Sequence, residues 1–166
     1  MRIRSAERDE AERIGCLTVA AYATLGEPLG DYVAVLRDVA ARLDTCEVAV
    51  AEDSDDGSLL GTLTYVPGLG PYAEWDDPDA AGIRFLAVDP AARGRGVAEA
   101  LVRWAMARAE AQGRARLLLH TTDHMHTAQR LYERLGFVRA PELDWWPRRG
   151  VRLLGYRYER SEQVAS

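Results

Sequence analysis

The chain has 166 residues, of which 48% are hydrophobic, and it carries a formal net charge of −5 at pH 7. That length and apolar content suffice for one domain with a continuous core and exclude two ordinary domains. The acidic balance argues against a nucleic-acid-binding protein, because such proteins bind mainly through a basic face that neutralises phosphates.

The first part of the chain predicts a strand followed by two helices. A short strand begins at Ile3, and apolar residues at intervals of three and four predict a helix over Glu7 to Tyr22. Asp31 is expected to cap a second helix, whose apolar stripe runs from Val33 to Leu43.

A hairpin, a long loop and a further strand are expected next. Residues 47–51 and 59–66 are rich in apolar and β-branched side chains, and the turn residues 55–58 between them predict an antiparallel pair. Residues 67–82 are crowded with Pro, Gly and Asp, which predicts a loop, and its length suggests a role over a site. An apolar strand follows over Ile83 to Val88.

The last part of the chain alternates helices and strands. The expected elements are a helix over Val97 to Gln112 that Gly113 stops, a strand over Arg116 to Thr122, a helix from a cap at Asp123 to Gly136, and strands at Phe137 to Arg139 and Val151 to Tyr158. We therefore expect a single domain over residues 1–160 and a frayed tail over residues 161–166.

The cellular location is predicted from sequence features that this chain lacks. No apolar run approaches the roughly 20 residues that span a bilayer, and the charged residues after Met1 are unlike a signal peptide. Cys16 and Cys46 are isolated and lack the spacing of a metal or redox site. We therefore expect a cytoplasmic protein with no membrane partner and no metal.

The stretch from Ile83 to Ala98, IRFLAVDPAARGRGVA, joins a strand to a helix through a corner rich in arginine and glycine. Gly94 and Gly96 carry no Cβ, so the backbone there can curl closely around a bulky anion. The first turn of the following helix has free N–H groups and a partial positive charge. Arg93 and Arg95 add full charges, so this corner is typical of a phosphate-binding site.

Two common phosphate-binding loops are excluded by spacing. No Gly-Lys-Ser/Thr follows the corner, and Glu99 stands at the third glycine of the dinucleotide-binding pattern. Arg93-x-x-Gly96-x-Ala98 instead matches the R/Q-x-x-G-x-G/A signature of the Gcn5-related N-acetyltransferase (GNAT) family. Residues 127–137, TAQRLYERLGF, resemble the second motif of that family, A-x-x-L-Y-x-x-x-G-F.

The resemblance implies an α/β fold with a mixed central sheet flanked by helices. Its two central parallel strands, here 83–88 and 116–122, would splay apart to admit acetyl-CoA, whose pantetheine arm would pair with unpaired main chain. Met125 stands where many relatives have an asparagine that bonds this arm, so the arm would be held with one hydrogen bond fewer, or His126 or Thr127 would bond it instead. The implied cofactor-binding residues are Leu86, Ala87, Val88, Arg93, Gly94, Arg95, Gly96, Val97, Ala98 and Thr127.

The resemblance also implies direct transfer of acetyl from acetyl-CoA to a primary amine of a small molecule or peptide. Tyr132 occupies the motif tyrosine, which in this family stands beside the thioester sulfur as general acid. Many relatives carry a glutamate near the start of the signature strand, where this chain has Gly82 or Arg84. We favour Glu74 of the long loop as the base. The other candidates are Asp76, His120, Asp123 and His124.

Other functions remain open from the sequence. The missing motif glutamate favours a non-catalytic acyl-CoA-binding or sensing module, whereas Tyr132 argues against it. An acyltransferase that uses a longer acyl-CoA is a further alternative. The acidic chain and its aromatic loops favour a cationic small amine as acceptor, either aminoglycoside-like, polyamine-like or amino-acid-like, over a basic protein tail. The apolar C-terminal strand is a candidate for joining a homodimer. The aromatic residues that would either line an acceptor pocket or cover the core are Tyr22, Tyr32, Tyr72, Trp75, Trp145 and Trp146.

Overall fold

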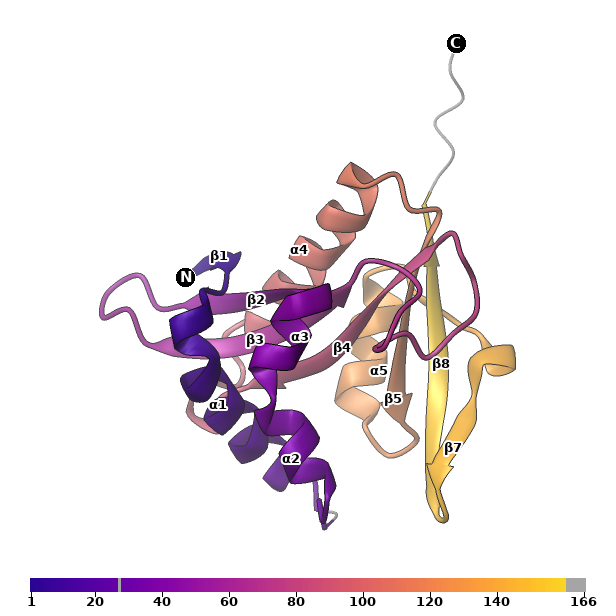
Figure 1. The fold of residues 1–166 in the computed structure, drawn as a ribbon. Coiled ribbons are helices and arrows are strands. Elements are labelled where there is room, and N and C mark those ends of the chain that lie inside the picture. Colours follow the sequence, from indigo (N-terminus) through magenta and orange to yellow (C-terminus); the bar gives the residue numbers. More distant parts are fainter. Residues whose placement is uncertain (27, 161–166) are drawn as a thin grey trace.

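A computed structural model describes residues 1–26 and 28–160, so the tail expected at 161–166 lies outside the described residues. Its central element is a mixed sheet with strand order β1-β2-β3-β4-β5-β8-β6, in which β7 also pairs with β8 (Figure 1). The strands are β1 (Arg2–Ser5), β2 (Glu47–Glu52), β3 (Leu59–Val66), β4 (Ala80–Val88), β5 (Arg116–Thr122), β6 (Val138–Arg139), β7 (Trp145–Arg148) and β8 (Val151–Glu159).

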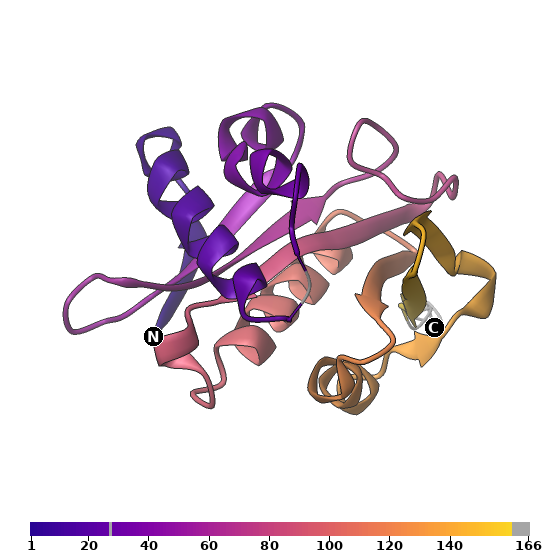
Figure 2. The same cartoon turned by 90° about the horizontal axis from the view of Figure 1, so that it is seen from below.

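Helices cover both faces of this sheet. The helices α1 (Ala11–Ala23), α2 (Tyr32–Arg37) and α3 (Val39–Thr45) lie on one face, and α4 (Val97–Ala111) and α5 (His126–Arg134) lie on the other (Figure 2). Every residue of β3 is buried, because both of its faces are covered. The architecture is the α/β fold with a mixed central sheet that the sequence predicted.

The parallel strands β4 and β5 pair only at their beginnings. The paired residues end at Gly82 and Leu118, after which β5 continues along β8 and β4 continues along β3. The two strands therefore diverge, as the expected splay requires. A bulge in β4 lies within the diverging part, where Phe85 takes a φ of 54°. A positive φ at a bulky residue is rare and marks a backbone that its surroundings hold in place.

The second predicted helix is broken into α2 and α3. Asp38 lies between them with a non-helical ψ of 64°, and its side chain accepts a hydrogen bond from the Ala41 N–H at 3.1 Å. Asp31 is the N-cap residue of α2, as predicted, but its side chain makes no capping hydrogen bond. An aspartate side chain readily accepts a hydrogen bond from a free N–H at the start of a helix. Asp38 therefore caps α3 and interrupts the predicted helix.

Several boundaries near the C-terminus also differ from expectation. β4 begins at Ala80, three residues before the predicted strand, and α5 begins at His126 with Met125, rather than Asp123, as its N-cap residue. The strand β7 was not predicted, because its Trp-Trp-Pro-Arg sequence lacks an alternating pattern. β8 has strand partners on both edges, so it does not offer the free edge on which the expected homodimer would depend.

Candidate functional site

A cleft of about 800 Å³ opens where β4 and β5 diverge. It extends from the end of α1, along β4 and the corner before α4, to the end of β5 and the first turns of α5. The residues of the predicted site that line it are Leu86, Ala87, Val88, Arg93, Gly94, Gly96, Val97, Ala98, Thr127 and Tyr132. Glu74 and Arg95 are not among the lining residues.

The corner before α4 presents unpaired main-chain donors. Gly94 and Gly96 have φ angles of 79° and 78°, a left-handed conformation that glycine adopts without strain. Across the described part of the chain, the backbone N–H groups from Arg93 to Glu99 find no hydrogen-bond acceptor. Because they gather at a helix N-terminus inside the cleft, they fit the diphosphate of a coenzyme A.

The two arginines of the corner have different surroundings. Arg93 lines the cleft, and its guanidinium donates to the hydroxyl of Thr24 in the turn after α1. Arg95 turns away from the cleft toward the β2–β3 turn, where its Nη2 lies 3.3 Å from Asp53 Oδ2. The side chain of Arg93 therefore lies at the cleft, as the predicted role requires, whereas the side chain of Arg95 is directed elsewhere.

Tyr132 brings a phenol from α5 to the cleft. The side chain is packed against the rings of Phe137 and Tyr156, and only 5% of the residue is exposed. Burial raises the pKa of Tyr132, so the hydroxyl stays protonated. Within residues 1–26 and 28–160 this hydroxyl has no hydrogen-bond partner, although the residue lines the cleft. A neutral donor is thus held ready for an acceptor atom in the cleft.

Glu74, Arg84 and His120 form a cluster at the other end of the cleft, where Arg84 and His120 are lining residues. Glu74 Oε1 lies 2.5 Å from Arg84 Nε, and Glu74 Oε2 lies 3.5 Å from His120 Nδ1. His120 Nε2 lies 2.8 Å from the carbonyl oxygen of Leu143. Because that oxygen only accepts, Nε2 carries a hydrogen, and Nδ1 is the nitrogen that faces the carboxylate.

The place of the missing motif glutamate is occupied by Trp75. A Cβ built on Gly82 would lie 2.1 Å from the Trp75 ring, so this ring rests directly on the glycine backbone. No side chain fits at position 82 while Trp75 is there. The strand start therefore carries no carboxylate at position 82, and Glu74 stands one residue before Trp75.

A buried arginine on α3 was missed by the sequence analysis. Arg42 is only 1% exposed, and its guanidinium lies 4.2 Å from the ring centre of Phe85. It donates to the carbonyl oxygens of Val35 at 2.8 Å and Leu36 at 3.1 Å, so it binds the free carbonyl end of α2. The pattern of apolar residues carried no signal for it, because an arginine on a short helix is usually solvated.

The aromatic residues considered for an acceptor pocket fall into three groups. Tyr22 lines the cleft, and Tyr32 and Tyr72 pack on Phe85 with ring centres 6.5 and 6.3 Å away. Trp75 covers Gly82. Trp145 and Trp146 lie in β7 and are exposed, with Trp146 at 61%.

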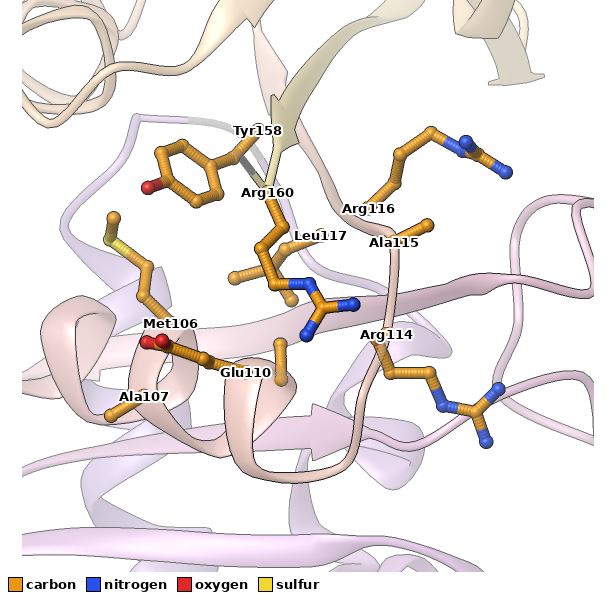
Figure 3. Close-up of a pocket in the computed structure, with 10 residues that line it drawn as sticks. Met106, Ala107, Glu110, Arg114, Ala115, Arg116, Leu117, Tyr158 and Arg160 are labelled. Atoms are coloured by element: carbon orange, nitrogen blue, oxygen red, sulfur yellow. The ribbon is translucent and has the colours of Figure 1, made fainter. Parts of the chain in front are cut away.

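A second, smaller pocket lies away from this chemistry. It measures about 290 Å³ and is lined at the C-terminal end of α4 and the adjoining ends of β5 and β8, with Glu110 and Arg160 beside it (Figure 3). It contains none of the predicted site residues. In the described ranges, no group of His, Cys, Asp and Glu side chains is placed to hold a metal, and no helix has the length and apolar character to cross a membrane.

Known proteins share both the sequence pattern and the fold. Residues 9–137 match the sequence model of a family described as the acetyltransferase (GNAT) family. A mycothiol acetyltransferase from Rhodococcus erythropolis is 34% identical over 90 residues, which cover 52% of this chain and 28% of that protein. The chain thus spans little more than a quarter of that relative's length.

Two solved structures show the likeness in fold. A ribosomal-protein-alanine N-acetyltransferase from Brucella melitensis has a TM-score of 0.72 and 20% identity, over 96% of this chain and 100% of that chain. A protein from Salmonella typhimurium, solved with its cofactor acetyl-CoA, has a TM-score of 0.72 and 20% identity, over 100% of this chain and 97% of that chain.

Proposed function

The chain belongs to the acetyltransferase (GNAT) family, and we propose that it transfers the acetyl group of acetyl-CoA directly to a primary amine of a small molecule. The observation that carries this proposal is the cleft between β4 and β5, with free main-chain donors at one end and titratable side chains at the other. We assign the activity to a single domain over residues 1–160.

Main-chain groups would hold the donor. The N–H groups from Arg93 to Glu99 and the guanidinium of Arg93 match a diphosphate in charge and in hydrogen-bonding capacity. Beyond Gly82, the edge of β4 that faces β5 has no strand partner, so Leu86, Ala87 and Val88 can pair with the amides of a pantetheine arm. When bound, acetyl-CoA supplies an activated acetyl thioester. Thr127 lines the cleft beside Met125 and offers a hydroxyl to the same arm.

Tyr132 stabilises the leaving thiolate. A phenol pKa of about 10 lies above a thiol pKa of about 8.5, and burial raises the pKa of Tyr132 further. Complete proton transfer from the phenol is therefore uphill, and a hydrogen bond to the sulfur is the favoured form of assistance. Among the described residues that line the cleft there is no cysteine or serine, which supports direct transfer over an acyl-enzyme.

The amine needs a proton acceptor. A primary amine with a pKa of about 10.4 is unprotonated in only about one molecule in 2,500 at pH 7, which corresponds to roughly 4.6 kcal/mol. Glu74 was the predicted base, but its carboxylate lies behind His120, which reaches the cleft. We therefore assign proton acceptance to the Glu74–His120 pair, in which the proton is shared between Glu74 Oε2 and His120 Nδ1.

We retain the cytoplasm as the proposed location. Cys16 and Cys46 are both free, which supports a reducing compartment.

The proposal is tested by following free thiol release from acetyl-CoA with a broad panel of primary amines, together with calorimetric binding of coenzyme A. Turnover with at least one amine supports the transferase. Binding of coenzyme A without any turnover supports the sensing module instead. Absence of binding at millimolar coenzyme A contradicts both. A parallel series of acyl-CoA thioesters of increasing chain length tests the third alternative, since preference for a longer chain would replace acetyl as the donor group.

A further inference from the structure

Positive charge exceeds negative charge at the amine end of the cleft. Two guanidinium groups, of Arg42 and Arg84, pack against the ring of Phe85, at 4.2 and 4.5 Å from its centre. In the described residues one carboxylate, that of Glu74, lies within 4 Å of this pair, and it contacts Arg84. One positive charge therefore remains unbalanced before any charge on His120 is counted.

Arg42 is the source of the imbalance. No carboxylate of the described chain lies within ion-pair distance of it, and its Nε is buried without a hydrogen-bond partner. Burial of a cation is unfavourable when its only partners are carbonyl oxygens and the face of an aromatic ring. A protein keeps such an arrangement where an incoming anion gains from it, because a charge in a water-poor site acts on its ligand with little screening.

Of the two arginines, Arg84 is the one that lines the cleft. Its Nε contacts Glu74, its Nη1 donates to the Tyr72 carbonyl oxygen at 3.3 Å, and the residue lines the cavity. The side chain of Tyr32 is a third hydrogen-bonding neighbour of Arg84. A guanidinium has five N–H donors in a planar fork that suits a carboxylate, so three contacts leave donor capacity for a ligand. Phe85, at the bulge, lines the cleft beside Arg84, and its ring contacts both guanidinium groups.

We infer that the acceptor is an amine that also bears a carboxylate, and that Arg84 binds this carboxylate while its amine faces His120. The inference rests on the proposed acetyl transfer and narrows its substrate class. Glu74 is already engaged by Arg84 and His120, so it does not offer a polyamine the free anion that such a ligand needs. Among the small amines that the acidic composition favoured, the inference thus selects the amino-acid-like acceptors.

The test compares matched acceptors with the intact protein and acetyl-CoA. Each pair is an α-amino acid and its carboxamide, which differ only in the carboxylate. The amide has the less basic amine, near the pKa of about 7.7 to 8.0 of an α-amino group in a peptide, so intrinsic reactivity favours the amide. A higher kcat/KM for the acid therefore reports recognition of the carboxylate. We expect at least one acid to exceed its amide by about tenfold or more.

Variants then test whether Arg84 is the residue that recognises the carboxylate. Arg84→Gln should bring the ratio of acid to amide close to unity, and Arg84→Lys, which keeps the charge, should retain part of the preference. Arg8→Gln, which removes an exposed arginine that precedes α1 and pairs with Asp44 of α3, is the matched control and should leave the ratio unchanged. The ratio of kcat/KM for acid and amide is measured on each folded variant. A general loss of activity lowers both values equally and therefore leaves this ratio unchanged.

Two results overturn the inference while the proposed function stands. The first is wild-type turnover of amides at least as efficient as that of acids across the panel. The second is a fall in Arg84→Gln that affects acid and amide equally. A lack of turnover with every pair, in a protein that binds coenzyme A by calorimetry, overturns the proposed function and this inference together.

Discussion

His120 Nδ1 faces Glu74 Oε2 across 3.5 Å, while His120 Nε2 is fixed by the carbonyl oxygen of Leu143 at 2.8 Å. The fixed tautomer leaves a lone pair on Nδ1 opposite a carboxylate oxygen. Two acceptors that face one another are stabilised by a proton between them. The two atoms therefore lie where they could share one proton, at the end of the cleft where we propose that the amine binds.

Replacing His120 by Gln should slow acetyl transfer about 10²-fold near neutral pH, because the amine loses its proton acceptor. The variant should regain activity as pH rises, since more of the amine is then unprotonated in solution. Glu74→Gln should show a smaller loss with the same trend, because Glu74 acts through the imidazole. The measurement is kcat/KM for the acceptor as a function of pH.

The matched control is Asp123→Asn, which removes another candidate base whose exposed carboxylate lies 3.5 Å from His124 Nδ1. It should behave as the wild type. A pH profile of His120→Gln that is parallel to that of the wild type would remove the pair from the mechanism.

Tyr132→Phe should lower kcat by about 10²-fold while the affinity for acetyl-CoA changes little. The phenyl ring keeps its packing against Phe137 and Tyr156, so only the hydroxyl is lost. Steady-state kinetics combined with calorimetric binding of coenzyme A separate the two effects. Tyr156→Phe removes a neighbouring hydroxyl that lies near Glu133, and it serves as the control for loss of a phenol from the same aromatic cluster. An unchanged kcat in Tyr132→Phe would exclude the tyrosine from the reaction.

Gly96→Ala should weaken coenzyme A binding and also destabilise the fold. A Cβ at position 96 meets no atom within 4 Å, so the cost arises from the φ of 78° alone. That cost is about 1–2 kcal/mol, and relaxation of the corner would move the N–H groups that face the cleft. Gly113→Ala is the matched control, because Gly113 has a φ of 68° and equally open surroundings at the other end of α4.

Chemical denaturation and calorimetry measure the two quantities separately. Both variants should lose similar stability, and only Gly96→Ala should lose affinity for coenzyme A. Equal affinity in the two variants would show that the corner does not contact the ligand.

Arg93→Gln and Arg95→Gln distinguish two residues that look equivalent in sequence. Arg93 lines the cleft, so its loss should weaken coenzyme A binding by about tenfold and reduce the salt dependence of that binding. Arg95 is paired with Asp53, so its loss should have a small effect. Titrations at low and high salt measure both. A larger effect at Arg95 than at Arg93 would mean that the corner rearranges when the ligand binds.

The sequence predicted the segments that line the donor end of the cleft, because each lies in one short stretch of chain. The spacing of Arg93, Gly96 and Tyr132 matched two family motifs, and all three residues line the cleft. The direction of the Arg95 side chain could not be predicted from the sequence, because it depends on Asp53 in a turn that is distant along the chain.

The acceptor end was less predictable because it is assembled from distant segments. Glu74 in a loop, Arg84 on β4 and His120 on β5 meet only after the sheet has formed. Arg42 reaches Phe85 only because Asp38 breaks the helix and a bulge turns the ring, and neither event follows from apolar periodicity. Contacts between segments decide such sites, whereas sequence patterns report mainly on neighbours in the chain.

Asp144 links stability to the catalytic pair. Its carboxylate is 7% exposed, it binds both terminal nitrogens of Arg139 at 2.8 Å, and it accepts from the Gly155 N–H at 2.7 Å. The hydrogen bonds from Arg139 lower the pKa of Asp144 to about 2. Because the folded-state pKa is depressed, the stabilisation is present above the unfolded pKa of about 3.9 and is lost as pH falls toward 2.

Asp144→Asn should therefore reduce the free energy of unfolding by about 2 kcal/mol at neutral pH, and the difference from the wild type should shrink between about pH 4 and pH 2. Glu142→Gln, which removes an exposed partner of Arg157 in the same turn, should change stability little. Asp144 directly follows Leu143, whose carbonyl oxygen orients His120, so Asp144→Asn should also shift the pH dependence of kcat/KM. Loss of stability with an unchanged pH profile would show that the turn supports the fold without positioning the histidine.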